Sequence, residues 1–180
     1  MADTVTTSFG IGDPVPPFSL PDTDGVAHAV PQDPAPAATV IAVTCNHCPH
    51  VIAWNPHIRR VAEEYGERGV RFLAINANDS ERYPADSLEA MQRFVRDQSW
   101  PIPYLYDESQ EVARAWGAKT TPDVFVTDAS GVVYRGAPDA DHGDPSLNAA
   151  WLREALEDVL AGRPVARPET KPVGCSIKWR

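Results

Sequence analysis

The segment Cys45–Pro49 (CNHCP) stands between two stretches of different periodicity, and this junction constrains the fold more than any other feature. Before it, Thr39–Val43 is short, apolar and mostly β-branched, a pattern typical of a strand buried on both faces of a sheet. After it, apolar side chains recur every three or four residues from Val51 to Tyr65, which predicts one buried helix face. The chain is therefore expected to place two cysteines at a strand-to-helix junction.

Around this junction the patterns predict strands and helices in alternation. Apolar residues that alternate on both sides of Asp22–Gly25 predict a short hairpin. The later expected elements are strand Val70–Ile75, helix Ser87–Asp97, extended segment Tyr104–Tyr106, helix Ser109–Trp116, strands Asp123–Thr127 and Val132–Arg135, and helix Ser146–Ala161. Asp86, three positions before Glu89, resembles a capping box for the helix that follows. We expect an α/β domain with a mixed central sheet and helices on both faces.

The chain of 180 residues is predicted to form one domain over residues 1–162, followed by a Pro-rich tail over residues 163–180. With 16 basic and 25 acidic residues its net charge is −9, which argues against a nucleic-acid or anionic-membrane partner. The longest apolar run falls far short of the ~20 residues that a membrane span needs. The start Met1–Thr4 has no basic region before an apolar stretch, so we expect no signal peptide and a cytoplasmic location.

The spacing of the two cysteines favours redox chemistry. Cys45 would precede the helix, where free N–H groups and the helix dipole stabilise a thiolate and lower its pKa. Cys48, one turn inside, can close a disulfide with it. His47 would stabilise the thiolate further, which makes the disulfide more oxidising.

Two plainer interpretations compete with a redox pair. The cysteines could be packed thiols, or half of a zinc site completed by His47, His50 and Cys175. Structural zinc sites usually offer a second close-spaced pair of ligands, and the sequence has none. We therefore expect no metal and no cofactor.

Four stretches resemble the redoxin branch of the thioredoxin-like proteins, which includes the alkyl hydroperoxide reductase/thiol-specific antioxidant family. These stretches are the entry Gly12–Gly25, the motif Thr44–Pro49, the segment Gly117–Val126 and the hairpin Asp128–Gly136. CNHCP, NANDSERYP and the ending GCSIKW are similar to one subgroup of these proteins. The resemblance implies a thioredoxin-like fold with an N-terminal hairpin.

The resemblance also implies a role for each site residue. Cys45 would be the attacking thiolate and Cys48 the resolving thiol. Thr121 and Pro122 would pack against the disulfide, with Pro122 in a cis peptide bond and the Thr121 backbone pairing with an extended substrate. Thr39 stands where thioredoxin has a buried acid, and Asp79 is the nearest replacement as a proton relay.

The expected function is disulfide exchange with a protein or small thiol substrate, recycled by a dithiol redox donor. The expected potential is less reducing than thioredoxin's value of about −270 mV. Peroxide reduction and a non-catalytic sensor or binding module are the alternatives; Thr44 does not have the spacing of the peroxiredoxin threonine. Cys175 is a candidate third redox thiol if Ile177 and Trp179 anchor the tail, and an exposed thiol on a frayed end if they do not. The oligomeric state is left open.

Overall fold

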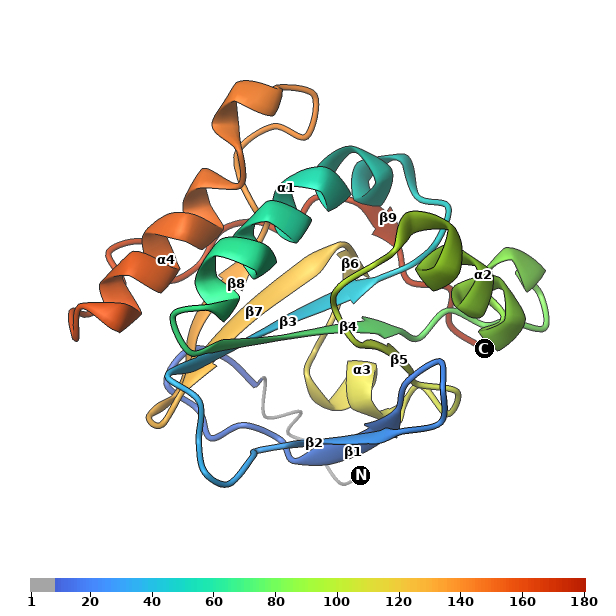
Figure 1. The fold of residues 1–180 in the computed structure, drawn as a ribbon, viewed down its shortest axis with the longest axis horizontal. Helices are drawn as coiled ribbons and strands as arrows, with labels where there is room; N and C mark the ends of the chain where they lie inside the picture. The colour runs from blue at the N-terminus through green and yellow to red at the C-terminus, as the bar shows by residue number, and fades with distance from the viewer. Residues whose placement is uncertain (1–8) are drawn as a thin grey trace, which may run out of the picture.

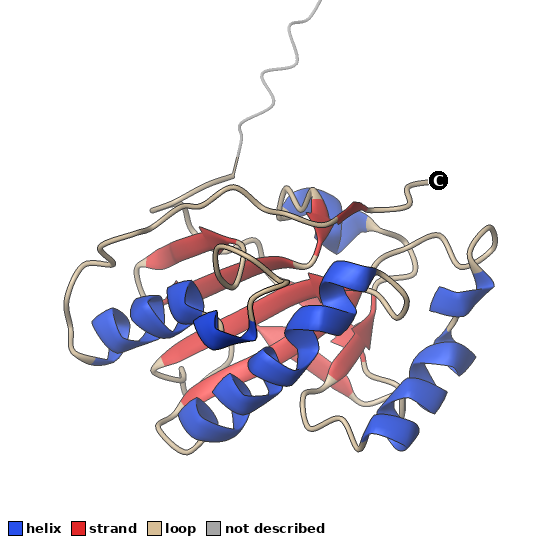
Figure 2. Ribbon diagram, turned by 90° about the horizontal axis from the view of Figure 1, so that it is seen from above, coloured by secondary structure: helices blue, strands red, loops and turns tan. Residues whose placement is uncertain are grey.

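The computed structural model describes residues 9–180, so Met1–Thr4, on which the signal-peptide expectation rests, lies outside the described residues. A central sheet is covered by helices on both faces (Figures 1 and 2). In chain order the elements are β1 (Phe18–Pro21), β2 (Ala27–Val30), β3 (Ala38–Thr44), α1 (Pro49–Gly66), β4 (Val70–Asn76), the 3-10 turn η1 (Pro84–Asp86), α2 (Leu88–Gln98), β5 (Tyr104–Tyr106), α3 (Glu111–Ala115), β6 (Thr120–Thr121), β7 (Asp123–Asp128), β8 (Gly131–Gly136), the 3-10 turn η2 (Pro145–Leu147), α4 (Ala150–Leu160) and β9 (Cys175–Ser176).

The main sheet has the strand order β5-β4-β3-β7-β8. Strands β3, β4 and β5 run parallel, whereas β7 is antiparallel to both of its neighbours, β3 and β8. All seven residues of β3 are buried, as expected for a central strand covered on both faces. The predicted mixed sheet is therefore confirmed.

Alternate residues of β3 face two separate cores. Val40 packs with Trp54 of α1 and Leu152 of α4 in the larger core. Ile41 faces the opposite core, which contains Trp116 after α3 and receives side chains of the β1–β2 hairpin. Both faces of the strand are thus apolar because both are covered, and this double coverage holds its carboxyl end, where the cysteine motif begins, in place.

The predicted cap of α2 and the predicted first residue of α4 are wrong. Helix α2 is capped by the Ser87 hydroxyl, which accepts a hydrogen bond from the Ala90 N–H at 3.2 Å, so Asp86 does not form the predicted capping box. Helix α4 begins at Ala150, four residues later than predicted, because Asn148 and Ala149 adopt positive φ values of 49° and 54° and separate it from η2. Both differences arise at turns, and the spacing of apolar residues gives no information about the backbone conformation of a turn.

The C-terminal tail returns to the domain. Figure 1 shows it in red, passing the N-terminal end of α1 to reach β6. There β9 pairs antiparallel with β6, with Thr121 opposite Cys175. Earlier in the tail, the Arg135 N–H donates to Pro168 O and the Thr170 N–H donates to Arg135 O, both at 3.0 Å. Within residues 9–180, none of the helices has the length and apolar character needed to span a membrane.

Candidate active site

The two motif cysteines lie where the sequence predicted, at the junction of β3 and α1. Cys45 follows the last residue of β3, and Cys48 is the N-cap of α1, with Pro49 in the first turn. Both side chains are almost fully covered: Cys45 is 2% exposed and Cys48 is 1% exposed. The N-cap position brings Cys48 close to the unpaired N–H groups of the helix start.

Cys45 lies in surroundings that favour its neutral form. Its Sγ atom is 3.4 Å from Thr121 Oγ1. Burial raises the pKa of the Cys45 thiol, and the nearby negative charge of Asp86 raises it further. A buried thiol beside a carboxylate keeps its proton because ionisation would place a second negative charge in a region that water does not reach.

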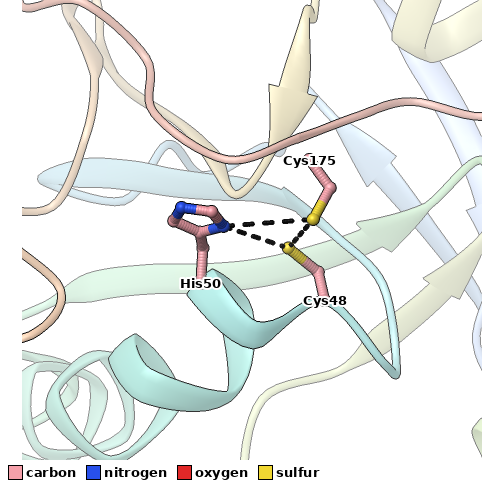
Figure 3. A group of neighbouring side chains, drawn as sticks. All are labelled: Cys48, His50 and Cys175. Carbon is pink, nitrogen blue, oxygen red and sulfur yellow. Dashed lines mark hydrogen bonds between the residues drawn. The ribbon is translucent and has the colours of Figure 1, made fainter.

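Cys48 lies among groups that favour its ionised form. Its Sγ atom is 2.6 Å from Cys175 Sγ and 3.7 Å from His50 Nδ1 (Figure 3). Burial acts to raise the pKa of Cys48, but hydrogen bonds from Cys175, from the Val51 backbone and from His50 outweigh it and lower the pKa to about 6. The sequence predicted a lowered pKa at Cys45; in this structure the pKa of Cys45 is raised and that of Cys48 is lowered.

The pKa of Cys175 shifts in the direction opposite to that of its neighbour Cys48. Burial and the adjacent Cys48 sulfur raise its pKa to about 11, because two sulfurs this close do not both carry a negative charge. Cys175 is half-buried, and all three cysteines are free thiols. Ile177 is 3% exposed and Trp179 packs against the same core, so the predicted anchors hold the tail and Cys175 is not on a frayed end.

His47 and Asp86 form the other side of the site. His47 Nδ1 lies 3.0 Å from Asp86 Oδ2, and the His47 side chain is 44% exposed. Asp86 is fully buried and accepts hydrogen bonds from the Asn46 N–H, at 2.8 Å, and from the side chains of Asn76 and Asn78. Sequence reasoning missed Asp86 because it treated this residue as a helix cap.

Asp79, the predicted proton relay, lies elsewhere. Its carboxylate oxygens are 3.5 Å from Arg82 Nε and 3.6 Å from Arg180 Nε. Within residues 9–180, Asp79 makes no hydrogen bond to Cys45 or Cys48. The buried acid beside Cys45 is Asp86. Asp86 is the last residue of η1 and lies ten positions after Asn76, the last residue of β4.

Thr121 contacts both cysteines of the motif. Its hydroxyl faces Cys45, and its carbonyl oxygen lies 3.3 Å from Cys48 Sγ, which donates to it when protonated. The bond between Thr121 and Pro122 is cis. Asp123, the next residue, is fully buried, and burial raises its pKa to about 6. The sequence alone did not single out this buried acid, which directly follows the Thr-Pro pair.

Two groups of side chains have the composition of partial metal sites. Cys48, His50 and Cys175 form one, and Cys45, His47 and Asp86 form the other; within each, the candidate ligand atoms lie within 4.8 Å of one another. Each group offers three ligands, whereas structural zinc sites use four. A groove of about 500 Å³ runs beside the motif, lined by residues that include Asn46, Ile52 and Trp100.

The fold and the cysteine pair at the end of β3 define a protein of the thioredoxin-like class. A solved putative thioredoxin from Neisseria meningitidis superposes with a TM-score of 0.60 at 24% identity, covering 81% of this chain and 96% of that one. A family model described as the AhpC/TSA family matches residues 11–135, and the chain belongs to that family.

Individual relatives differ in how much of the chain they match. The thiol-disulfide oxidoreductase ResA of Halalkalibacterium halodurans is 28% identical over 89 residues, which cover 49% of this chain and 47% of ResA. The chain thus matches about half the length of this curated relative. An uncharacterized conserved protein from Geobacillus kaustophilus is 42% identical with a TM-score of 0.90, covering 97% of this chain and 94% of that one. The tail region therefore has a counterpart in a solved structure.

Proposed function

We propose that this protein is a thiol-disulfide oxidoreductase whose redox centre is the Cys45–Cys48 pair. The observation that carries the proposal is the position of both thiols at the β3–α1 junction, each in contact with Thr121. The family match and the partial similarity to ResA agree with oxidoreductase chemistry. The substrate is a disulfide in a protein or a small molecule, and a second dithiol protein supplies the electrons.

The reaction follows the usual course of disulfide exchange. The Cys45 thiolate attacks one sulfur of the substrate disulfide, forms a mixed disulfide and releases the first substrate thiol. Cys48 then attacks the Cys45 sulfur, so that the protein disulfide forms and the second substrate thiol leaves. Two electrons and two protons pass to the substrate. No cofactor takes part.

Assigning the attack to Cys45 requires its surroundings to change. In the closed site burial and Asp86 raise the pKa of Cys45, while Cys48 is the residue whose pKa is lowered. Displacement of Cys175 would admit water to the site and remove the proton donor of Cys48. Both changes favour Cys45 over Cys48 as the thiolate that meets an external disulfide.

The test is a redox titration of the purified chain against thiol-disulfide buffers. We expect a reversible two-electron couple between about −270 and −180 mV, the span from thioredoxin to protein disulfide isomerase. His47 should shift it toward the oxidising end if it stabilises a thiolate, and the His47→Ala variant measures that shift. A pair that does not titrate as a disulfide would contradict the proposal and direct attention to bound metal or to a non-catalytic role.

Peroxide reduction is the second candidate, and the lowered pKa of Cys48 favours it. The Cys48 thiolate would attack the O–O bond and become a sulfenic acid while the alcohol or water leaves. Cys175, whose sulfur is 2.6 Å away, would condense with it to form a disulfide and release water. Within residues 9–180 no arginine hydrogen bonds to Cys48. Peroxide consumption that depends on Cys48 and survives in Cys45→Ser would favour this candidate over disulfide exchange.

A further inference from the structure

We propose that strand β9 is a built-in exchange partner, which occupies the substrate-docking edge of β6 and accepts a disulfide from Cys48 through Cys175. The strand closes the site when it is docked and must leave before an external disulfide enters. The inference rests on the proposed function for the formation of the Cys45–Cys48 disulfide. The inference adds a third cysteine to the reaction and specifies the backbone conformation that a substrate must have.

The first observation is that the tail pairs with β6 as an added strand. β6 is two residues long, and its partners are Ser176, opposite Thr120, and Cys175, opposite Thr121. Extended peptides bind exposed sheet edges in this way, with main-chain hydrogen bonds for affinity and side chains for specificity. The edge beside Pro122 is thus occupied by this chain itself, with a cysteine at the position that faces the redox pair.

The second observation is that contacts beyond Cys175 hold the tail in this position. Ile177 is buried in the core beneath β3, and the Arg114 guanidinium lies 4.2 Å above the ring of Trp179. The Lys178 carbonyl accepts hydrogen bonds from the Asp79 N–H and the Gln110 side chain, at 2.8 and 2.9 Å. A terminus held by so many specific contacts is a docked element of the fold.

The third observation concerns Gly174, the residue before the cysteine. A Cβ atom added there would lie 2.1 Å from the Thr121 carbonyl oxygen, much closer than the two atoms can approach. Only glycine lets the tail backbone come this near to β6. This close approach is what places Cys175 Sγ 2.6 Å from Cys48 Sγ.

The chemistry balances without an external oxidant once the Cys45–Cys48 disulfide exists. The Cys175 thiolate attacks Cys48 Sγ, the Cys45–Cys48 bond breaks, and the Cys48–Cys175 bond forms. Cys45 leaves as a thiolate and takes up the proton that Cys175 gave up. His50 Nδ1, at 3.7 Å from Cys48 Sγ and 3.9 Å from Cys175 Sγ, is placed to hold that proton during the exchange (Figure 3). One disulfide is present before and after the step.

This arrangement also describes the substrate. With the tail docked, Cys45 and Cys48 are 2% and 1% exposed, so a protein substrate must displace β9 to reach them. A segment that replaces β9 must be extended, must present its half-cystine opposite Thr121, and must have a very small residue just before it. The proposed substrate class is therefore an extended polypeptide with a disulfide-bonded Gly-Cys or similar sequence.

The experiment maps disulfides in the full chain after oxidation with glutathione disulfide, acid quenching, alkylation and mass spectrometry. The wild-type sample should contain molecules with a Cys45–Cys48 disulfide and others with a Cys48–Cys175 disulfide, and Cys45→Ser should form Cys48–Cys175, the one internal disulfide that its two remaining cysteines allow. Gly174→Ala should reduce the Cys48–Cys175 fraction roughly tenfold or more, because overpacking of this kind is strongly unfavourable. Gly66→Ala is the matched control, since a Cβ there meets nothing within 4 Å.

The inference is overturned if Cys45→Ser yields only glutathione adducts, or if Gly174→Ala retains the wild-type Cys48–Cys175 fraction. Its failure is distinct from failure of the proposed function. A chain that titrates through Cys45–Cys48 and reduces disulfides, but never forms Cys48–Cys175, contradicts only the role of the tail. A chain that forms Cys48–Cys175 but reduces no disulfide contradicts the proposed function and leaves the tail disulfide standing.

Discussion

The two halves of the candidate site each pair a cysteine with a histidine, but they differ in the third group, and the pKa values of their cysteines shift in opposite directions. Cys45 lies with His47 and Asp86, and Cys48 lies with His50 and Cys175. In the first half the third group is a buried carboxylate that brings negative charge, and the pKa of the cysteine rises. In the second half the third group is a thiol that donates a proton, and the pKa of the cysteine falls to about 6. Burial acts to raise the pKa in both halves, so the direction depends on the neighbouring groups, among which Asp86 and Cys175 act in opposite senses.

The largest expected effect comes from removing one cysteine from each half. Cys48→Ser should lower disulfide-reducing turnover by more than roughly a hundredfold and accumulate a mixed disulfide on Cys45, because the resolving thiol is gone. Mass spectrometry of the trapped adduct identifies the attacking residue. Both variants are compared with Cys175 also replaced by serine, so that no third thiol resolves the adduct; if Cys45→Ser then accumulates it and Cys48→Ser does not, the attack belongs to Cys48 and the proposed roles are exchanged.

The next effect tests the proton donor in the Cys48 half. Cys175→Ala removes the donor, so the pKa of Cys48 should rise from about 6 toward or above its ordinary value of 9.0. At pH 7 the ionised fraction would fall from about nine-tenths to about one per cent if the pKa reaches 9.0. Ultraviolet absorbance of the thiolate against pH measures this change. Cys175→Ser is the matched control: its hydroxyl still donates, so an equal shift in both variants would disprove the hydrogen-bond explanation.

A smaller effect tests the carboxylate in the Cys45 half. Asp86→Asn removes the negative charge and should lower the pKa of Cys45, which the pH dependence of alkylation reports in a chain whose other two cysteines are alanine. The change should also cost about 1–3 kcal/mol of unfolding free energy, because the new amide N–H₂ faces donors that Asp86 accepted from.

Asp79→Asn is the control for this change. Asp79 is also buried, but it pairs with arginines and, among residues 9–180, does not belong to the Cys45–His47–Asp86 cluster, whose candidate ligand atoms lie within 4.8 Å of one another. The reactivity of Cys45 should therefore be unchanged in Asp79→Asn. An increase equal to that of Asp86→Asn would mean that the charge acts from a distance and that the contact with Asp86 is irrelevant.

The smallest effect is a pH dependence of stability in the reduced chain. The folded pKa of Cys48, about 6, lies below the ordinary value of 9.0 that applies on unfolding. A depressed pKa contributes stability that is fully present above pH 9 and is lost as the pH falls toward 6. Urea unfolding at pH 8 and pH 6 should therefore show a larger loss for the wild type than for Cys175→Ala. Equal losses would show that Cys48 is not ionised in the folded chain.

Local patterns in the sequence predicted most of the fold. The all-apolar run of β3, the helical period of α1 and the turn signals of both hairpins each reflect a periodicity that short stretches of chain carry by themselves. Helix starts were less well predicted, because the Ser87 cap and the positive φ values at Asn148 and Ala149 depend on particular turns. The mixed sheet followed from the order of elements, since parallel strands need crossovers and hairpins do not.

The sequence by itself determined that two cysteines stand at a strand-to-helix junction in a redoxin-like chain. Only the tertiary structure decided what each cysteine touches. Asp86 and not Asp79 reaches Cys45, and Cys175 reaches Cys48 from 127 positions away along the chain. The pKa values follow these contacts because the charge of a buried thiol responds to groups a few ångströms distant. Such neighbours come from remote segments brought together by folding, and no local periodicity records them.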